Sequence, residues 1–151
     1  MRLVQEQVNV RPQGWRPGGS GSRRFPIINT VPASDATVRD SQLEDEIDIP
    51  DAFWLGAGDP QVYRVTGDCM TGARIFNGNT IIIDAARTEP REGQIVVAQV
   101  NGGLTLKRFY RTASGVELRP DAPGYESIFV KRSEELVICG VLHKVYDGGE
   151  R

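Results

Sequence analysis

The sequence of 151 residues lacks the features that mark several large classes of protein. Its two cysteines, Cys69 and Cys139, are too few for a disulfide framework, so a reducing cytoplasmic location is the simpler expectation. No stretch approaches the roughly 18 apolar residues of a membrane span, and the first residues lack the apolar core of a signal peptide. A single histidine and no glycine-rich phosphate loop leave no pattern for a metal or other cofactor. These absences predict one globular domain without membrane contact.

Charge is balanced over the whole chain but unevenly distributed along it. A net charge of −2 gives no overall attraction to nucleic acid. Residues 1–24 contain five arginines, one acidic residue and several prolines and glycines, which predicts a flexible basic arm. Residues 40–59 contain seven acidic residues and no basic one, and we interpret this block as a solvated surface. The alternative is that it pairs with the basic arm, within one chain or across a dimer.

From residue 62 onward, short apolar runs alternate with turn signals, which is typical of strands. Asn101-Gly102-Gly103 predicts a hairpin turn, and Gly140 predicts a bulge in the last strand. Residues 51–55 and 70–75 are expected to form single helical turns. The pattern therefore predicts a mostly all-β fold, a twisted sandwich or partly open barrel with short helical turns. The expected strands cover residues 62–65, 80–84, 94–100, 104–110, 116–119 and 136–145.

Two of these segments contain residues that suggest a chemical reaction. Cys69 lies in Gly67-Asp68-Cys69-Met70, a turn with glycine, and Lys107 lies inside the later apolar run. A nucleophile beside an amine that burial keeps neutral is the arrangement of a catalytic dyad. A thiol also ionises more easily than a hydroxyl. The alternatives are that Cys69 packs as a small apolar side chain and that Lys107 points into solvent, as most strand lysines do.

The order of these segments resembles the self-cleaving domain shared by LexA, UmuD and lambda-type phage repressors, a family of Ser-Lys peptidases. The resemblance covers residues 25–146. Gly67-Asp68-Cys69-Met70 matches the turn that holds the family's nucleophilic serine, and Leu106-Lys107-Arg108 matches the segment that holds its lysine. The other matches are Gly78-Asn79 before an apolar strand, then Leu118, Pro120, Tyr125 and Ile128, and finally Gly140-Val141-Leu142.

The resemblance implies that the substrate is the chain itself. Residues 25–34 match the run that leads to the family's scissile bond, so cleavage is expected between Ala33 and Ser34. Tethering supplies an effective molarity of about 10⁵ M or more, so a modest nucleophile is sufficient. The implied parts are a basic arm (1–24), a cleavage-site segment (25–40) and a peptidase and dimerisation domain (41–151). The implied site residues are the nucleophile Cys69, the base Lys107, and Gly67, Asp68 and Met70 of the oxyanion turn.

Four positions depart from the family pattern. Cys69 replaces its serine, Ser34 replaces its glycine after the scissile bond, Pro32 precedes the scissile Ala33, and Asn79 replaces an aspartate. Pro32 has no N–H and so cannot donate a strand hydrogen bond to the site. These departures support a second interpretation, a catalytically impaired dimerisation module of a transcriptional regulator.

The resemblance also implies partners: a second copy of the chain, forming a homodimer, and a recombinase filament that acts as co-protease. Residues 1–24 are too short and too rich in proline and glycine for a helix-turn-helix domain. DNA contact is therefore expected only through such a domain outside this chain. The chain would then be a UmuD-like protein with a short arm or the C-terminal part of a stress-response or phage-type repressor. His143, expected on one strand face with Cys139 and Val141, is interpreted as structural.

Overall fold

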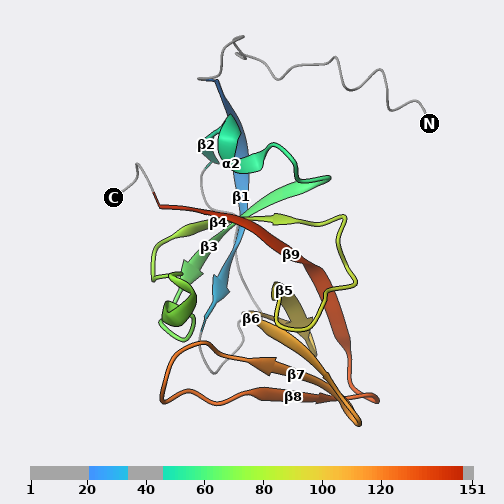
Figure 1. Ribbon diagram of the computed structural model, residues 1–151. Coiled ribbons are helices and arrows are strands. Elements are labelled where there is room, and N and C mark those ends of the chain that lie inside the picture. The colour runs from blue at the N-terminus through green and yellow to red at the C-terminus, as the bar shows by residue number, and fades with distance from the viewer. Residues whose placement is uncertain (1–20, 34–45, 148–151) are drawn as a thin grey trace, which may run out of the picture.

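The computed structural model describes residues 21–33 and 46–147, which form one open sheet of nine strands (Figure 1). The strand order is β2-β1-β3-β4-β9-β5-β6-β7-β8. β1 and β3 run parallel, and the other neighbouring strands run antiparallel. The elements are β1 Ser22–Pro32, β2 Glu46–Pro50, α2 Asp51–Trp54, β3 Pro60–Thr66, η1 Thr71–Ala73, β4 Thr80–Asp84, β5 Ile95–Val100, β6 Gly103–Thr112, β7 Gly115–Arg119, β8 Ile128–Lys131 and β9 Leu136–Tyr146.

The predicted all-β class is confirmed, and each predicted apolar run lies in a strand. The two expected helical turns are present as α2 and η1, and neither is long and apolar enough to cross a membrane. Asn101 and Gly102 join β5 to β6 with φ of 49° and 90°, the positive values of a tight hairpin turn. The sequence patterns missed three strands, β1, β2 and β8. In β2, buried Ile47 and Ile49 alternate with exposed acidic residues, so a strand signal was present inside the acidic block interpreted as a solvated surface.

β1 begins inside the segment expected to be a flexible arm. Its first residue is Ser22, so Arg23 and Arg24 belong to the strand, while residues 1–20 lie outside the described part of the chain. Arg24 lies 3.8 Å from Glu46 and 3.3 Å from Asp48 of β2, which pairs with β1. The described end of the arm therefore contacts the acidic block within one chain. These side chains are more than half exposed, so the pairs contribute little to stability.

β9 curves the sheet because it contains irregular positions. It pairs with β4 on one side and β5 on the other, and its register with β5 slips by one residue next to Gly140. A Cβ at Gly140 would lie 2.7 Å from the Asp84 carbonyl oxygen and 3.0 Å from the Ala85 Cα, so only glycine fits. The predicted bulge is confirmed. The sheet curls enough for β1 to contact β6, although four strands separate them in the sheet order.

Three apolar clusters of buried residues fill the interior. One lies between β1, β2 and β4, and another between β5, β6, β7 and β8. The third includes Cys69 and Ala33, so the predicted nucleophile and the predicted cleavage position share one piece of core. Its buried members are Val31, Ala33, Tyr63, Val65, Cys69, Met70, Ile75, Ile81, Ile83, Ile95, Val97 and Leu106.

Candidate functional site

The parallel pairing of β1 with β3 brings the predicted cleavage segment to the predicted nucleophile. Parallel strands end at the same edge of a sheet, and Pro32 of β1 lies opposite Thr66 of β3. The next residue, Ala33, donates its N–H to the Thr66 carbonyl at 2.6 Å. The Ala33 carbonyl then accepts a hydrogen bond of 3.0 Å from the backbone N–H of Cys69. The nucleophile candidate therefore contacts the carbonyl of the expected scissile bond through its own backbone.

The turn that follows β3 is shaped by a glycine. Gly67 has φ of 93°, a conformation that disfavours other residues, and its N–H donates to Asn77 Oδ1 at 3.0 Å. Cys69 and Met70 are fully buried, whereas Asp68 is exposed. Of the expected turn residues, only Asp68 directs its side chain to the surface.

Asn79 closes the loop that leads from this turn to β4. Its side-chain Oδ1 accepts the Phe76 N–H at 2.8 Å, and its carbonyl accepts the Val65 N–H at 2.9 Å. An amide oxygen thus occupies the acceptor position that a carboxylate would fill. Asn79, although it departs from the family pattern, therefore makes a local hydrogen bond that supports the turn.

Lys107 is the largest fully buried side chain in the described part of the chain, which excludes the solvent-exposed alternative. Its Nζ donates to Thr105 Oγ1 at 2.9 Å. Thr105 is also fully buried, and its hydroxyl lies 3.5 Å from the Pro32 carbonyl oxygen. Residues two apart on a strand share a face, so Thr105 and Lys107 point to the same side of β6. Thr105 was not identified from the sequence, although a polar residue that alternates with lysine in an apolar strand was a usable signal.

These contacts converge on the two residues Pro32 and Ala33. Lys107 is connected to Pro32 through the Thr105 hydroxyl, and Cys69 is connected to Ala33 through its backbone N–H. Ser34, on the far side of the expected scissile bond, lies outside the described residues. The arrangement combines a thiol, a buried amine and a backbone donor directed at one carbonyl, which are the components of acyl transfer.

Comparison with known proteins identifies the family. The Peptidase S24-like model matches residues 26–143. The chain belongs to the Peptidase S24-like family. The LexA repressor of Thermotoga petrophila is 32% identical over 141 residues, covering 93% of this chain and 71% of that protein. The LexA repressors of Desulfatibacillum aliphaticivorans and Citrifermentans bemidjiense are 33% and 35% identical over 135 and 130 residues, covering 85% and 84% of this chain and 65% and 63% of theirs. This S24-like chain is thus a LexA-like regulatory domain.

The other titratable residues of the S24-like domain that sequence analysis singled out lie apart from these contacts. His143 Nε2 lies 3.1 Å from the Leu55 carbonyl oxygen, joining β9 to the end of α2. The expectation that His143, Cys139 and Val141 share a face is wrong, because bulges interrupt the alternation of β9. Val141 belongs to the β5–β8 cluster, whereas Cys139 packs against the cluster of Cys69, and burial raises the pKa of its thiol. Within 21–33 and 46–147, no three His, Cys, Asp or Glu side chains gather as metal ligands would.

Proposed function

We propose that this S24-like domain cuts its own chain between Ala33 and Ser34, with Cys69 as nucleophile and Lys107 as base. One observation carries the proposal, the 3.0 Å hydrogen bond from the Cys69 N–H to the Ala33 carbonyl oxygen. A donor at that position stabilises the negative charge that forms on the oxygen when the carbonyl carbon is attacked. Because the segment is tethered and already paired with β3, little further ordering is needed.

The first half of the proposed reaction forms a thioester. The Cys69 thiol gives its proton to the Lys107 amine, and the thiolate attacks the Ala33 carbonyl carbon. The resulting oxyanion accepts the Cys69 N–H. The bond between the Ala33 carbon and the Ser34 nitrogen then breaks, and the Lys107 ammonium returns its proton to that nitrogen. The chain now has a free N-terminus at Ser34, but its two parts stay joined, because the Ala33 carbonyl carbon is esterified to the Cys69 sulfur of the part that begins at Ser34.

The second half hydrolyses the thioester. Neutral Lys107 takes a proton from water, and the hydroxide attacks the Ala33 carbonyl carbon. The carbon–sulfur bond breaks, and the thiolate recovers a proton from Lys107. One water is consumed, and the carboxylic acid formed at Ala33 releases its proton to solvent to give a C-terminal carboxylate. Thr105 supports both halves, because its hydroxyl contacts both the Lys107 amine and the substrate backbone at Pro32.

The proposed biological consequence is regulatory. Cleavage after Ala33 breaks the covalent link between β1, with whatever precedes it, and the rest of the β-domain, so it would switch off a repressor or activate a damage-response factor. Several relatives are LexA repressors, which supports a role in transcriptional control. We extend the proposal to a homodimer and to a recombinase filament as the trigger. The second candidate, a dimerisation module that no longer cuts, is supported by the cysteine at position 69.

The decisive experiment measures the mass of purified full chain incubated from pH 7 to about pH 10, where a lysine amine is increasingly neutral. A fragment beginning at Ser34 is expected, and it should be absent in Cys69→Ala and in Lys107→Ala. Cys139→Ala and Lys144→Ala are matched controls, since one changes the half-buried cysteine and the other an exposed lysine of β9. A chain that stays intact at every pH would favour the dimerisation module.

A further inference from the structure

The turn of Cys69 is attached by backbone hydrogen bonds to a distant residue, Asp121. The Asp121 N–H donates to the Cys69 carbonyl at 2.8 Å, and the Gly72 N–H donates to the Asp121 carbonyl at 2.6 Å. The backbone of Asp121 is therefore hydrogen bonded to both ends of the segment from Cys69 to Gly72. These bonds link the nucleophile turn to the loop between β7 and β8.

The Asp121 side chain connects the same loop to the strand of Lys107. Arg108, the residue after Lys107, contacts Asp121 Oδ2 through Nε at 3.0 Å and Nη2 at 2.9 Å. Its Nη1 donates to the Gly93 carbonyl at 2.7 Å, so the guanidinium is held by two partners, the Asp121 carboxylate and the Gly93 carbonyl. A planar guanidinium engaged in this way fixes orientation as well as distance. Both side chains are about one-third exposed, at 31% and 32%.

The close packing of Gly72 on Asp121 leaves no space between the turn and the loop. A Cβ at Gly72 would collide with the Asp121 carboxylate and lie 2.6 Å from its carbonyl oxygen. Displacement of Asp121 would therefore be transmitted to the turn, because the two backbones are in contact and hydrogen bonded.

We infer that the Arg108–Asp121 pair positions the Cys69 turn relative to Lys107. The inference rests on the proposed function, because the turn and the strand carry its nucleophile and base. Neither residue is offered as catalytic: Asp121 acts through the Cys69 backbone, and Arg108 acts through Asp121. A misplacement of about 1 Å at a reacting group can lower a rate by about 100-fold.

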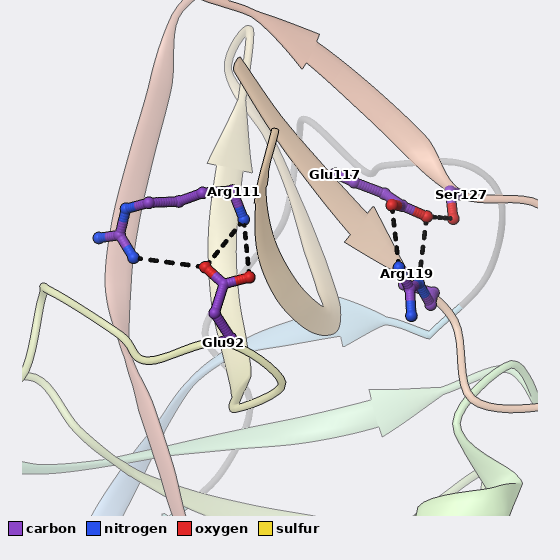
Figure 2. A network of polar contacts seen from close by, with 5 residues as sticks. All are labelled: Glu92, Arg111, Glu117, Arg119 and Ser127. Carbon is purple, nitrogen blue, oxygen red and sulfur yellow. Dashed lines mark hydrogen bonds and ion pairs between the residues drawn. The ribbon is translucent and has the colours of Figure 1, made fainter. Parts of the chain in front are cut away.

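The test compares variants of this pair with variants of the neighbouring ion pair of β7, in which Arg119 lies opposite Arg108 in the sheet. Asp121→Asn removes the charge and keeps the size of the side chain, whereas Arg108→Gln removes both the charge and the guanidinium end. The controls are Arg119→Gln and Glu117→Gln, whose ion pair of 3.1 Å lies on β7 beside Ser127 (Figure 2). The rate of cleavage per folded molecule should fall by about 10- to 100-fold in the first two variants and by less than about twofold in the controls. Arg108→Lys should recover only part of the loss, since lysine lacks the planar fork.

A second measurement does not depend on cleavage. In the Cys69→Ala background, hydrogen exchange of the Gly72 and Asp121 amides should rise by about tenfold with Arg108→Gln and stay unchanged with Arg119→Gln. Unchanged exchange with Arg108→Gln would overturn the inference. So would faster exchange with an unchanged cleavage rate, because the pair would then stabilise the loop without positioning the nucleophile. If mass spectrometry detects no cleavage of the parent chain, the proposed function is wrong. The hydrogen-exchange measurement still tests whether the Arg108–Asp121 pair holds the Cys69 turn.

Discussion

Lys107 is an unusual residue because its long, ionisable side chain is completely inside the protein. Burying such a group is unfavourable unless it is hydrogen bonded, and the Thr105 hydroxyl is one of its partners. Thr105 is itself buried and reaches the Pro32 carbonyl. A core that only needed to be stable would place apolar side chains here, so the polar pair supports a chemical role.

Replacing Cys69 by serine tests whether sulfur limits turnover. Cys69→Ser is expected to restore or accelerate cleavage after Ala33, because the buried lysine, the tethered segment and the backbone donor stay unchanged. Time courses by mass spectrometry measure the rate. If Cys69→Ser stays intact at high pH, we expect the obstacle to lie at Pro32 and Ser34. Replacing Pro32 with Ala and Ser34 with Gly in the Cys69→Ser background tests this. Failure there too would leave a dimerisation domain that does not cut.

Removing the Thr105 hydroxyl tests how the base is held. Thr105→Val keeps the shape but deletes an acceptor for the Lys107 amine, so the cleavage rate should fall at least about tenfold. The free energy of unfolding should fall by about 1 to 3 kcal/mol, because a buried donor loses an acceptor. Thr105→Ser keeps the hydroxyl and is the control. Equal cleavage rates in Thr105→Val and the parent would exclude Thr105 from the site.

The end of β4 illustrates how a strand end is held in this fold. The Asp84 carboxylate accepts backbone N–H groups from Gly58, Asp59 and Ala86, each at 3.0 Å. Burial opposes ionisation of Asp84, but these donors together hold the pKa of its carboxyl below its usual range. The strand end, the loop before β3 and the turn after β4 thus depend on one negative charge.

Asp84→Asn should therefore weaken the fold in a pH-dependent way. Because the pKa of Asp84 is lower in the folded state, its ionised carboxylate stabilises the protein at pH values above the unfolded-state pKa of about 4. This stability is lost as the pH falls through the folded-state pKa. We expect Asp84→Asn to lose about 1 to 3 kcal/mol at pH 7 and less below pH 4. Urea unfolding at both pH values measures this. Asp59→Asn, which alters an exposed carboxylate, should behave like the parent.

The stability of the whole domain at alkaline pH depends on Tyr63 in its core. Burial, with a smaller contribution from Cys139, raises the pKa of Tyr63 to about 12. The folded state therefore favours the neutral phenol. The contribution of Tyr63 to the free energy of unfolding is complete below its unfolded-state pKa of about 10 and is lost as the pH rises toward 12.

Tyr63→Phe should extend the alkaline range of the folded domain. The parent is expected to lose about 2 to 3 kcal/mol between pH 10 and pH 12 that Tyr63→Phe retains, because phenylalanine does not ionise. Urea unfolding followed by circular dichroism measures the difference. Tyr125→Phe, at a residue 37% exposed, is the control. An equal loss in the parent and Tyr63→Phe would show that another group limits the fold, and cleavage assays are best kept below about pH 10.

The β-domain is expected to form a homodimer. The apolar last strand cannot offer an edge for this contact, because β9 lies between β4 and β5 in the sheet. A face remains, with Val137 52% exposed on β9. Sedimentation at about tens of micromolar should detect the dimer, and Val137→Glu should weaken it. A parent that sediments as monomer at that concentration would contradict the prediction.

Local chemistry by itself determined much of this protein. The β-class, the Asn101–Gly102 hairpin, the Gly140 bulge and the two helical turns follow from short-range preferences of backbone and side chain. The family and its Cys69 turn follow from the order of short motifs. The strands β1, β2 and β8 were not predicted, although β2 alternates acidic and apolar residues as a strand does.

Only the tertiary structure decided which groups meet. Thr105 reaches Pro32 because the curled sheet brings β1 against β6, and no pattern within either strand contains that contact. Asp121 joins the Cys69 turn to Arg108 across three separate segments. The bulges of β9 separate Cys139 from Val141 in the same way, by pairing with two neighbours of different register. Side-chain alternation is a property of one strand, whereas a site depends on how strands distant in sequence pack together.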